Sequence, residues 1–371
     1  MNPAEPKVKR GTPSRLPELV ETVNKVMRSK APKGYGMGEA FPHLFSSENA
    51  SNLYYIESDG KVVSHAGFVK YRCNINGSSI SVASLGSVAT LPEYRGRQYA
   101  TKILRCIFSD LEKGDTSLLL ISGTRGLYKR MECIETGRML RARVSEGEIA
   151  QIRTHSASDV RHIPEKGRAG EGKRLLKIYR AEPYRYHRDS KFMRTVLNAF
   201  WFRRHDWNMQ LFEVERGGSL MAYAVASTDS RNPEHVKIWE WAGSRQAFFE
   251  SLADITSYYA GRSIEFSFLP DDFSMLSILA SNNIAYSEEN IQGTVRPMNV
   301  IRLIAELQPW FSEHLGAEVK VSTIAKGTWT FAGPFGTKKI VGAAKLTKWL
   351  FGTGRGSLGI QLMKTDDLNY I

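Results

Sequence analysis

A basic, glycine-bearing turn at residues 95–101 has the composition of a phosphate-binding loop. Its residues are Arg95, Gly96, Arg97, Gln98, Tyr99, Ala100 and Thr101. The turn follows a β-type segment, and from Ala100 onward apolar residues recur at helical spacing as far as Leu111. Backbone N–H groups at the start of a helix lack intrahelical partners, and the helix dipole favours an anion there. We therefore expect the turn to bind a pyrophosphate; an ordinary solvated turn is the alternative.

Three β-type segments precede this turn and a fourth follows the helix. The first three cover residues 52–57, 61–73 and 78–90, and they are separated by Asp59-Gly60 and Asn76-Gly77. Such dipeptides favour type I′ hairpin turns because their residues accept positive φ. The apolar run 117–122 fits a buried parallel strand. An antiparallel meander, a crossover helix and a parallel strand are expected, with the turn at the end of the third strand.

The order of strand, arginine-bearing turn, Ala100 and helix resembles the acetyl-CoA signature of the GCN5-related N-acetyltransferase (GNAT) superfamily. Gln98 stands where that family usually has glycine. The resemblance implies a mixed α/β sheet whose last two strands splay apart, with the pantetheine arm of acetyl-CoA lying between them. It also implies main-chain contacts to acetyl-CoA from Ser87, Val88 and Ala89, and phosphate contacts from residues 95–101.

The segment 122–130 is similar to a stretch of the Eis (enhanced intracellular survival) acetyltransferases that carries a tyrosine acting as general acid. Tyr128 matches that tyrosine, whereas Glu132 stands where glycine is usual. A phenol with an ordinary pKa of ~10 can donate a proton to a thiolate whose conjugate acid has a pKa near ~8.5. The alternative is that Tyr128 is a half-buried aromatic residue whose hydroxyl donates a hydrogen bond to a backbone carbonyl.

The chain, at 371 residues, is too long for one such domain. Residues 1–150 are expected to form the catalytic GNAT domain, and the polar stretch 151–173 a linker or exposed excursion. Residues 174–292 repeat the order of elements of the first domain, but residues 242–247 lack the double-arginine turn. We interpret them as a degenerate GNAT copy that has lost the cofactor.

Residues 293–371 show a different pattern. Pro297 is expected to open a helix, which is followed by two strands and a second helix. The resemblance to Eis-like proteins covers nearly the whole chain and implies that this part is a short sterol-carrier-like domain. In such proteins the terminal carboxylate acts as the catalytic base, which implies that role for Ile371. A frayed, solvated tail is the alternative.

Three residues near the meander are candidates for substrate contacts, namely His43, Phe45 and Tyr54. His43 precedes the first meander strand, where this fold builds its acceptor pocket; a hydrogen-bonding surface histidine is the alternative. The three cysteines have no metal-ligand spacing, so we expect neither a disulfide framework nor a metal site.

Composition favours a cytoplasmic protein. No apolar run approaches the ~20 residues of a membrane span, and the first residues lack the apolar region of a signal peptide. The net charge of +13 is spread along the chain without a Lys/Arg-rich run, which argues against a nucleic-acid-binding protein.

The resemblance to Eis-like acetyltransferases implies an enzyme that transfers acetyl from acetyl-CoA directly to a primary amine of an aminoglycoside, a polyamine or a lysine side chain. The acceptor is thus a small molecule or a peptide. A non-catalytic acyl-CoA or lipid sensor is the alternative, and whether the chain forms a homo-oligomer stays open.

Overall fold

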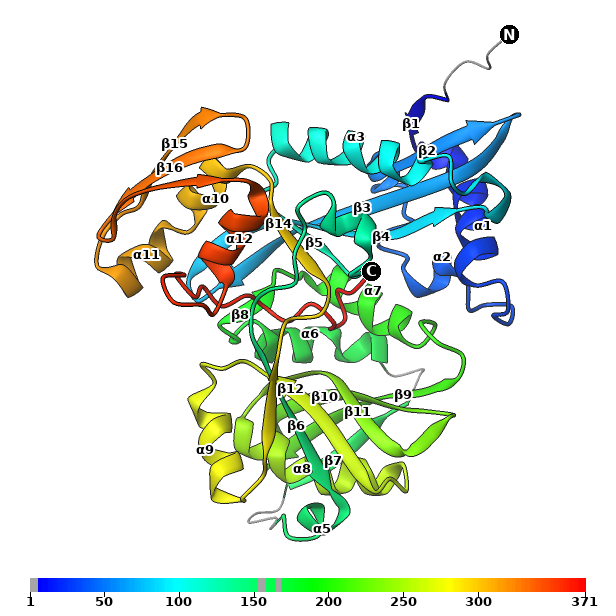
Figure 1. Ribbon diagram of the computed structural model, residues 1–371. Coiled ribbons are helices and arrows are strands. Elements are labelled where there is room, and N and C mark those ends of the chain that lie inside the picture. Colours follow the sequence, from blue (N-terminus) through cyan, green and yellow to red (C-terminus); the bar gives the residue numbers. More distant parts are fainter. Residues whose placement is uncertain (1–5, 153–157, 165–167) are drawn as a thin grey trace. The chain divides into compact units, whose positions relative to one another are not determined.

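The computed structural model describes residues 6–152, 158–164 and 168–371. The chain divides into two compact units. The first holds the chain up to Gly137, with Gln292–Thr365 and Tyr370–Ile371, and the second holds Arg138–Ile291 and Asp366–Asn369. The chain thus leaves the first unit at Gly137 and returns to it at Gln292, which the colours along the ribbon trace (Figure 1).

The sheet of the first unit has the strand order β1-β2-β3-β4-β5-β14. Its strands are β1 (Val8–Arg10), β2 (Leu53–Ser58), β3 (Lys61–Ile75), β4 (Ser78–Thr90), β5 (Leu118–Ile121) and β14 (Thr294–Pro297). Strands β2, β3 and β4 form antiparallel hairpins, β4 pairs parallel with β5, and β14 pairs antiparallel with β5. Asp59-Gly60 and Asn76-Gly77 form the two hairpin turns with positive φ at every residue. The expected meander and parallel strand are confirmed.

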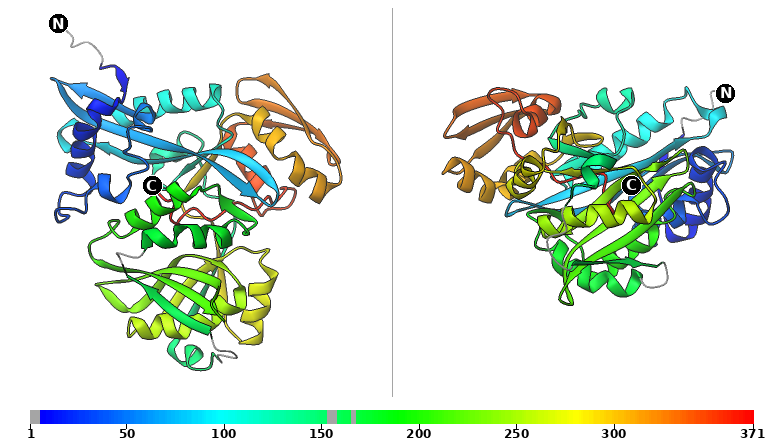
Figure 2. Two further views of the ribbon diagram at one scale, coloured as in Figure 1. Left: turned by 180° about the vertical axis from the view of Figure 1, so that it is seen from behind. Right: turned by 90° about the horizontal axis from the view of Figure 1, so that it is seen from below.

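Helix α3 (Tyr99–Lys113) connects β4 to β5 and packs its apolar side on the sheet. Ile103, Ile107 and Leu111 are buried there with Phe68 and Leu85. Each such side chain contributes about 1.5–3 kcal/mol on burial, so this face fixes the helix on the strands. Helix α1 (Leu16–Met27) packs on β3 and β4 from the opposite side of the sheet (Figure 1, Figure 2).

The short elements of this part of the chain are the helices α2 (Met37–Ala40) and α4 (Gly126–Lys129), and the 3-10 turns η1 (Pro13–Arg15), η2 (Ala50–Asn52) and η3 (Pro92–Tyr94).

The second unit repeats this topology with a sheet of order β13-β6-β12-β11-β10-β9-β7. Its strands are β6 (Met139–Ser145), β7 (Ser158–Ile163), β9 (Trp207–Arg216), β10 (Ser219–Asp229), β11 (Asn232–Gly243), β12 (Ser263–Phe268) and β13 (Tyr286–Glu289). The other elements are α5 (Glu146–Ile149), α6 (Arg168–Tyr179), β8 (Tyr184–Tyr186), α7 (Ser190–Phe200), α8 (Arg245–Tyr258) and α9 (Phe273–Ser281). A meander of β9, β10 and β11 leads through α8 into β12, which is parallel to β11.

The stretch 151–173, expected to be a linker, contains β7 and the beginning of α6. Strand β7 is at the edge of its sheet and pairs with β9 alone on this path, so its sequence needs few apolar residues. Residues 153–157 and 165–167 of the expected linker lie outside the described residues. The second unit begins at Arg138, inside the expected first domain of residues 1–150 and ahead of the expected start at residue 174, because β6 pairs with β12.

Residues 292–365 group with the first unit. Their elements after β14 are α10 (Val300–Glu306), α11 (Gln308–Leu315), β15 (Lys320–Ala325), β16 (Thr328–Gly333), β17 (Gly336–Val341) and α12 (Ala343–Phe351). The last three strands form an antiparallel sheet of order β15-β16-β17. The expectation that Pro297 opens a helix is wrong, since Pro297 ends β14 and α10 begins at Val300.

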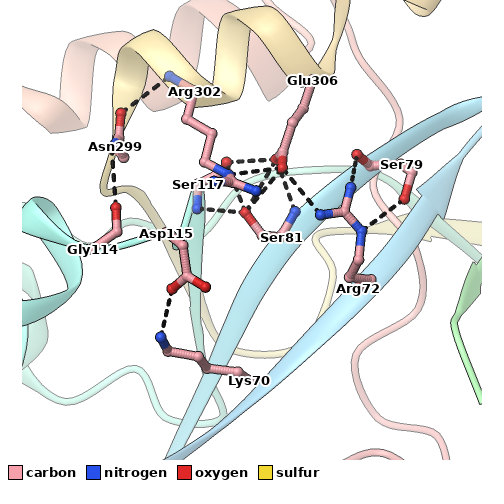
Figure 3. Close-up of polar contacts among 10 residues, drawn as sticks. All are labelled: Lys70, Arg72, Ser79, Ser81, Gly114, Asp115, Ser117, Asn299, Arg302 and Glu306. Atoms are coloured by element: carbon pink, nitrogen blue, oxygen red, sulfur yellow. Dashed lines mark hydrogen bonds and ion pairs between the residues drawn. The ribbon is translucent and has the colours of Figure 1, made fainter.

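A carboxylate on α10 fastens this part to the first sheet (Figure 3). Glu306 accepts hydrogen bonds from the Ser81 N–H at 2.8 Å on β4 and from the Ser117 hydroxyl at 2.6 Å. Arg302, one helical turn earlier, donates to the same carboxylate at 2.9 Å. Because the Glu306 side chain is only 11% exposed, these charge-assisted bonds hold α10 against β4 and the start of β5.

Candidate active site

The turn between β4 and α3 presents an open helix N-terminus. Gly96 and Gln98 both have left-handed backbone conformations, with φ of 79° and 59°. Gln98 is the N-cap of α3, yet its side chain makes no capping hydrogen bond. The first intrahelical bond runs from the Lys102 N–H to the Gln98 carbonyl, so the N–H groups of residues 99–101 lack intrahelical acceptors. These groups can hold an anion such as a pyrophosphate.

The two arginines of the turn are exposed and held by weak local contacts. Arg95 donates from Nε to the Thr90 carbonyl at 3.3 Å. Arg97 lies over the Tyr94 ring, with its guanidinium carbon 4.9 Å from the ring centroid. Their charges therefore remain available beside the helix N-terminus, and the predicted phosphate contacts from residues 95–101 fit this geometry.

Strand β4 separates from β5 just before this turn. The parallel register runs from Val82–Leu118 to Leu85–Ile121 and ends there, whereas β4 continues to Thr90. Ser87, Val88 and Ala89 lie in this extension, where the strand edge no longer pairs with β5 in that register. An extended ligand can hydrogen-bond to such an edge, as the resemblance implied for pantetheine.

A bulge with a buried histidine behind it interrupts the same stretch of β4. Ser87 has φ of 49°, a left-handed conformation that non-glycine residues rarely adopt. The Ser87 carbonyl accepts a hydrogen bond from Nδ1 of His65 at 3.0 Å. His65 is fully buried and its ring stacks on Phe45, with the centroids 5.8 Å apart. Burial lowers the pKa of His65 to about 4, so the imidazole is neutral at pH 7.

Tyr128 lies on α4, directly after the Gly123 segment, and is 5% exposed. Its ring occupies the space beside Gly123, because a Cβ there would lie 2.9 Å from Cε2 of Tyr128. Burial is the main cause that raises the pKa of Tyr128, while the nearby Arg125 opposes the shift. The phenol is therefore protonated at neutral pH and is able to donate a proton.

The carboxyl group of Ile371 lies against β4 of the same unit. A Cβ built on Gly86 would be 2.8 Å from the carboxyl carbon of Ile371 and 2.9 Å from its oxygen. Ile371 is 4% exposed, so this end is packed rather than frayed. The structure thus brings Ile371 to the strand that also carries Ser87, Val88 and Ala89.

The residues just before Ile371 are held within the second unit. The fully buried Arg188 donates from Nε to the Asn369 side chain at 2.7 Å and pairs with both oxygens of Glu240 at 2.7 Å. Arg203 donates to the carbonyls of Asp367 at 2.9 Å and of Leu368 at 2.7 Å. The backbone ahead of the last two residues is therefore fixed by charged side chains at several points.

The three candidate substrate contacts do not lie together. Phe45 stacks on His65, and His43, which is 8% exposed, packs edge-on to Phe41. Tyr54 instead lies in the apolar core beneath α3 and donates to Asp110 on that helix at 2.6 Å. Its hydroxyl is therefore engaged by α3, and contact of Tyr54 with a substrate stays a prediction.

The corresponding turn of the second unit is filled by its own side chains. Ser244 caps α8 by accepting from the Ala247 N–H at 3.3 Å. Arg245 pairs with Glu182 at 2.7 Å and with Asp272 at 2.9 Å. Because the cap is occupied and the arginine is neutralised, this helix N-terminus is a poorer anion site than that of α3.

Comparison with known proteins adds a domain match and a fold to this geometry. Residues 7–134 match the family model of the acetyltransferase (GNAT) domain. No curated protein matches the sequence. Among solved structures the chain is similar to a probable N-acyltransferase from Enterococcus faecalis V583, at TM-score 0.67 and 14% identity over 92% of this chain and 86% of that one.

Two further solved structures are similar over most of their length. A GCN5-related N-acetyltransferase from Anabaena variabilis gives TM-score 0.65 at 11% identity, over 99% of this chain and all of that one (100%). Eis1 from Mycobacterium abscessus gives TM-score 0.62 at 11% identity, over 92% of this chain and 88% of that one. The expected mixed α/β GNAT fold is confirmed over most of the chain. Within the described parts of the chain, every helix is too short or too polar to cross a membrane.

Proposed function

We propose that the protein is an acyl-CoA-dependent N-acyltransferase that moves acetyl from acetyl-CoA to a primary amine. The observation that carries the proposal is the uncapped N-terminus of α3, which directly follows β4 at the end where β4 no longer pairs with β5. The match of residues 7–134 to the GNAT domain model supports the same chemistry. Gln98 and Glu132, the two departures from glycine, both keep left-handed conformations, with φ of 59° and 60°. The turns they form therefore retain the backbone course that glycine would give.

In the proposed reaction, the N–H groups of residues 99–101 and the two arginines hold the pyrophosphate, and main-chain groups of residues 87–89 hold the pantetheine arm. The Ile371 carboxylate removes a proton from the acceptor ammonium. The freed amine nitrogen then bonds to the acyl carbon as the carbon–sulfur bond breaks. Tyr128 donates its proton to the departing thiolate and regains one from the new amide nitrogen, so protons and electrons balance. Transfer is direct and needs no acylated side chain.

We further propose an Eis-like organisation, in which the second unit is a GNAT copy without cofactor. The filled turn at Ser244 and Arg245 supports this, as does the similarity to Eis1 over 88% of that chain. The proposed acceptor is a primary amine of an aminoglycoside, a polyamine or a peptide lysine. The sterol-carrier-like assignment of residues 293–371 belongs to the same proposal.

Calorimetry with acetyl-CoA tests the cofactor site. Arg95→Glu places a negative charge beside the phosphates and should weaken binding more than tenfold, since each charged contact contributes about 1.5–3 kcal/mol. Arg105→Glu makes the same charge change at an exposed position on α3 and is the matched control. Equal affinity of the wild type and Arg95→Glu would refute the site.

A thiol-release assay with a panel of amines tests the reaction. Tyr128→Phe keeps the ring beside Gly123 and removes one hydroxyl, so acetyl-CoA affinity should persist while kcat falls about 10²-fold. Full activity of Tyr128→Phe would remove this tyrosine from the mechanism. If the wild type binds acetyl-CoA but releases no thiol with any amine, the protein is a sensor.

A further inference from the structure

The bulge of β4 is defined by its pairing with β3. Gly67 pairs with Gly86, and His65 pairs with Ala89. A step of two residues on β3 therefore faces a step of three on β4, and the extra residue lies at Ser87 and Val88. A bulge changes the direction of the main-chain N–H and C=O groups, and the left-handed conformation of Ser87 sets the direction of the peptide groups that follow it.

His65 supplies the hydrogen bond that replaces the lost ladder contact. Nδ1 of His65 lies 3.0 Å from the Ser87 carbonyl and 3.4 Å from the Ser87 hydroxyl. A carbonyl oxygen can only accept, so the shorter contact favours the neutral ring with its proton on Nδ1. Nε2 is then an acceptor, and it finds no hydrogen-bond partner among the described residues. A buried acceptor without a partner disfavours folding, so apolar packing alone does not account for a histidine at this position.

The rest of the surroundings fixes the ring in this orientation. Phe45 stacks on it at an interplanar angle of 29°. Gly67 lies beside the ring, and a Cβ there would be in ordinary contact with it, 3.5 Å from Cε1 of His65. The polar contacts of the ring, from Nδ1 to the Ser87 carbonyl at 3.0 Å and to the Ser87 hydroxyl at 3.4 Å, are therefore both to the bulge.

We infer that His65 is a positioning residue for acyl transfer, whose Nδ1–H bond to the Ser87 carbonyl holds the bulge so that the main chain of Val88 and Ala89 faces the acyl group. The inference rests on the proposed function, because it is in that reaction that residues 87–89 contact the cofactor. Displacement of these peptide groups by a fraction of an ångström would misplace the thioester while leaving the distant phosphate site intact.

Three substitutions separate the hydrogen bond from packing. His65→Asn places an amide N–H near the position of Nδ1, whereas His65→Gln places its amide near Nε2 and His65→Phe has no donor. We expect kcat to fall about 10²-fold in His65→Phe and His65→Gln, with a smaller loss of coenzyme A affinity because the phosphate site is intact. In His65→Asn, kcat should recover about tenfold or more. The matched control is Thr22→Val, which removes a buried side-chain bond to the Val62 carbonyl of β3 at 3.3 Å and should leave kcat unchanged.

Equal kcat in the wild type and a folded His65→Phe would overturn the inference, as would a His65→Asn variant as inactive as His65→Phe. Where a variant fails to fold, ¹⁵N chemical shifts of the wild-type imidazole test the inference, because they show whether the proton is on Nδ1 or on Nε2. An Nε2–H tautomer would overturn the inference on its own. If the wild type itself neither binds acetyl-CoA nor releases thiol, the proposed function fails first, and the tautomer still tests the bond.

Discussion

Replacing Gly86 with alanine tests the placement of the Ile371 carboxyl group with a single methyl. The backbone of Gly86 is outside the left-handed region, so alanine is tolerated by the strand and its effect is steric. The new Cβ would lie 2.8 Å from the carboxyl carbon of Ile371, 2.9 Å from its oxygen and 3.2 Å from Cγ1. Ordinary contact begins at 3.4 Å, so the carboxyl group must move by several tenths of an ångström.

If that carboxylate removes the proton from the amine, this displacement should lower kcat about 10- to 100-fold, since an error of about 1 Å at a reacting group costs about 10²-fold. Acetyl-CoA affinity should persist, because the phosphate site lies beyond the end of β4. The free energy of unfolding should fall by about 1–3 kcal/mol, the usual cost of overpacking. Steady-state kinetics, calorimetry and urea unfolding measure the three quantities.

Gly67→Ala is the matched control. Gly67 pairs with Gly86, and its Cβ would lie 2.5 Å from Cδ2 of Leu53 and 3.2 Å from Cδ1 of Leu44 rather than near Ile371. It should therefore reduce stability similarly while retaining most of kcat. Deleting Ile371 in the Gly86→Ala background should cost less stability than the sum of the two single changes and should not restore activity, a non-additive result that reports direct contact. If folded Gly86→Ala turns over like the wild type, the carboxyl group of Ile371 is not the base.

Three further predictions concern stability. Gln98→Gly and Glu132→Gly should each raise the free energy of unfolding, measured in urea, by about 0.5–1 kcal/mol. A left-handed backbone conformation destabilises the folded state by about 1–2 kcal/mol at an L-residue but not at glycine. The greater freedom of glycine in the unfolded chain offsets part of this gain. The pKa of His65 is about 4 in the folded protein, so the unfolded chain takes up the proton first as pH falls. The free energy of unfolding should therefore drop by about 3 kcal/mol between pH 6.5 and 4. This drop should be absent in His65→Phe. Arg188→Met leaves the buried Glu240 without its charged partner and should cost about 3–5 kcal/mol, most of which Arg188→Met with Glu240→Leu should recover.

Each of these predictions has a clear contrary result. A glycine substitution that lowers stability would show that the left-handed side chains are held by favourable contacts. An acid-induced loss that survives in His65→Phe would assign it to other groups. An additive double substitution at Arg188 and Glu240 would mean that the two side chains do not interact energetically.

The parts of the fold encoded by neighbouring residues could be predicted from the sequence. The hairpin dipeptides and the apolar spacing of α3 act over a few residues, and both are observed. Strand β14 could not be predicted, because its partner β5 lies more than 150 residues earlier in the chain and its four residues carry no periodicity of their own. Pro297 was a misleading signal, since proline at a helix start and proline at the end of an edge strand look alike in sequence.

The sequence names candidate residues for the site, but it does not reveal the residues that position them. Arg95 and Tyr128 have side chains that suggest a role by themselves. Gly86 carries no side chain, and its importance appears only when Ile371 lies against it. His65 sits within a run of strand residues, and only the register with β4 shows that it meets a bulge. The pairing of Arg188 with Asn369 likewise joins residues that no local pattern connects.

The return of the chain at Gln292 has a consequence for how the protein is made. Strand β5 pairs with β4 on one edge and with β14 on the other, so the sheet translated first keeps an open edge until the whole second unit has been synthesised. An unpaired strand edge is a template for association with other chains. A fragment that stops at Gly137 should therefore aggregate, seen as concentration-dependent light scattering, unless a peptide containing residues 292–299 is supplied to close the sheet.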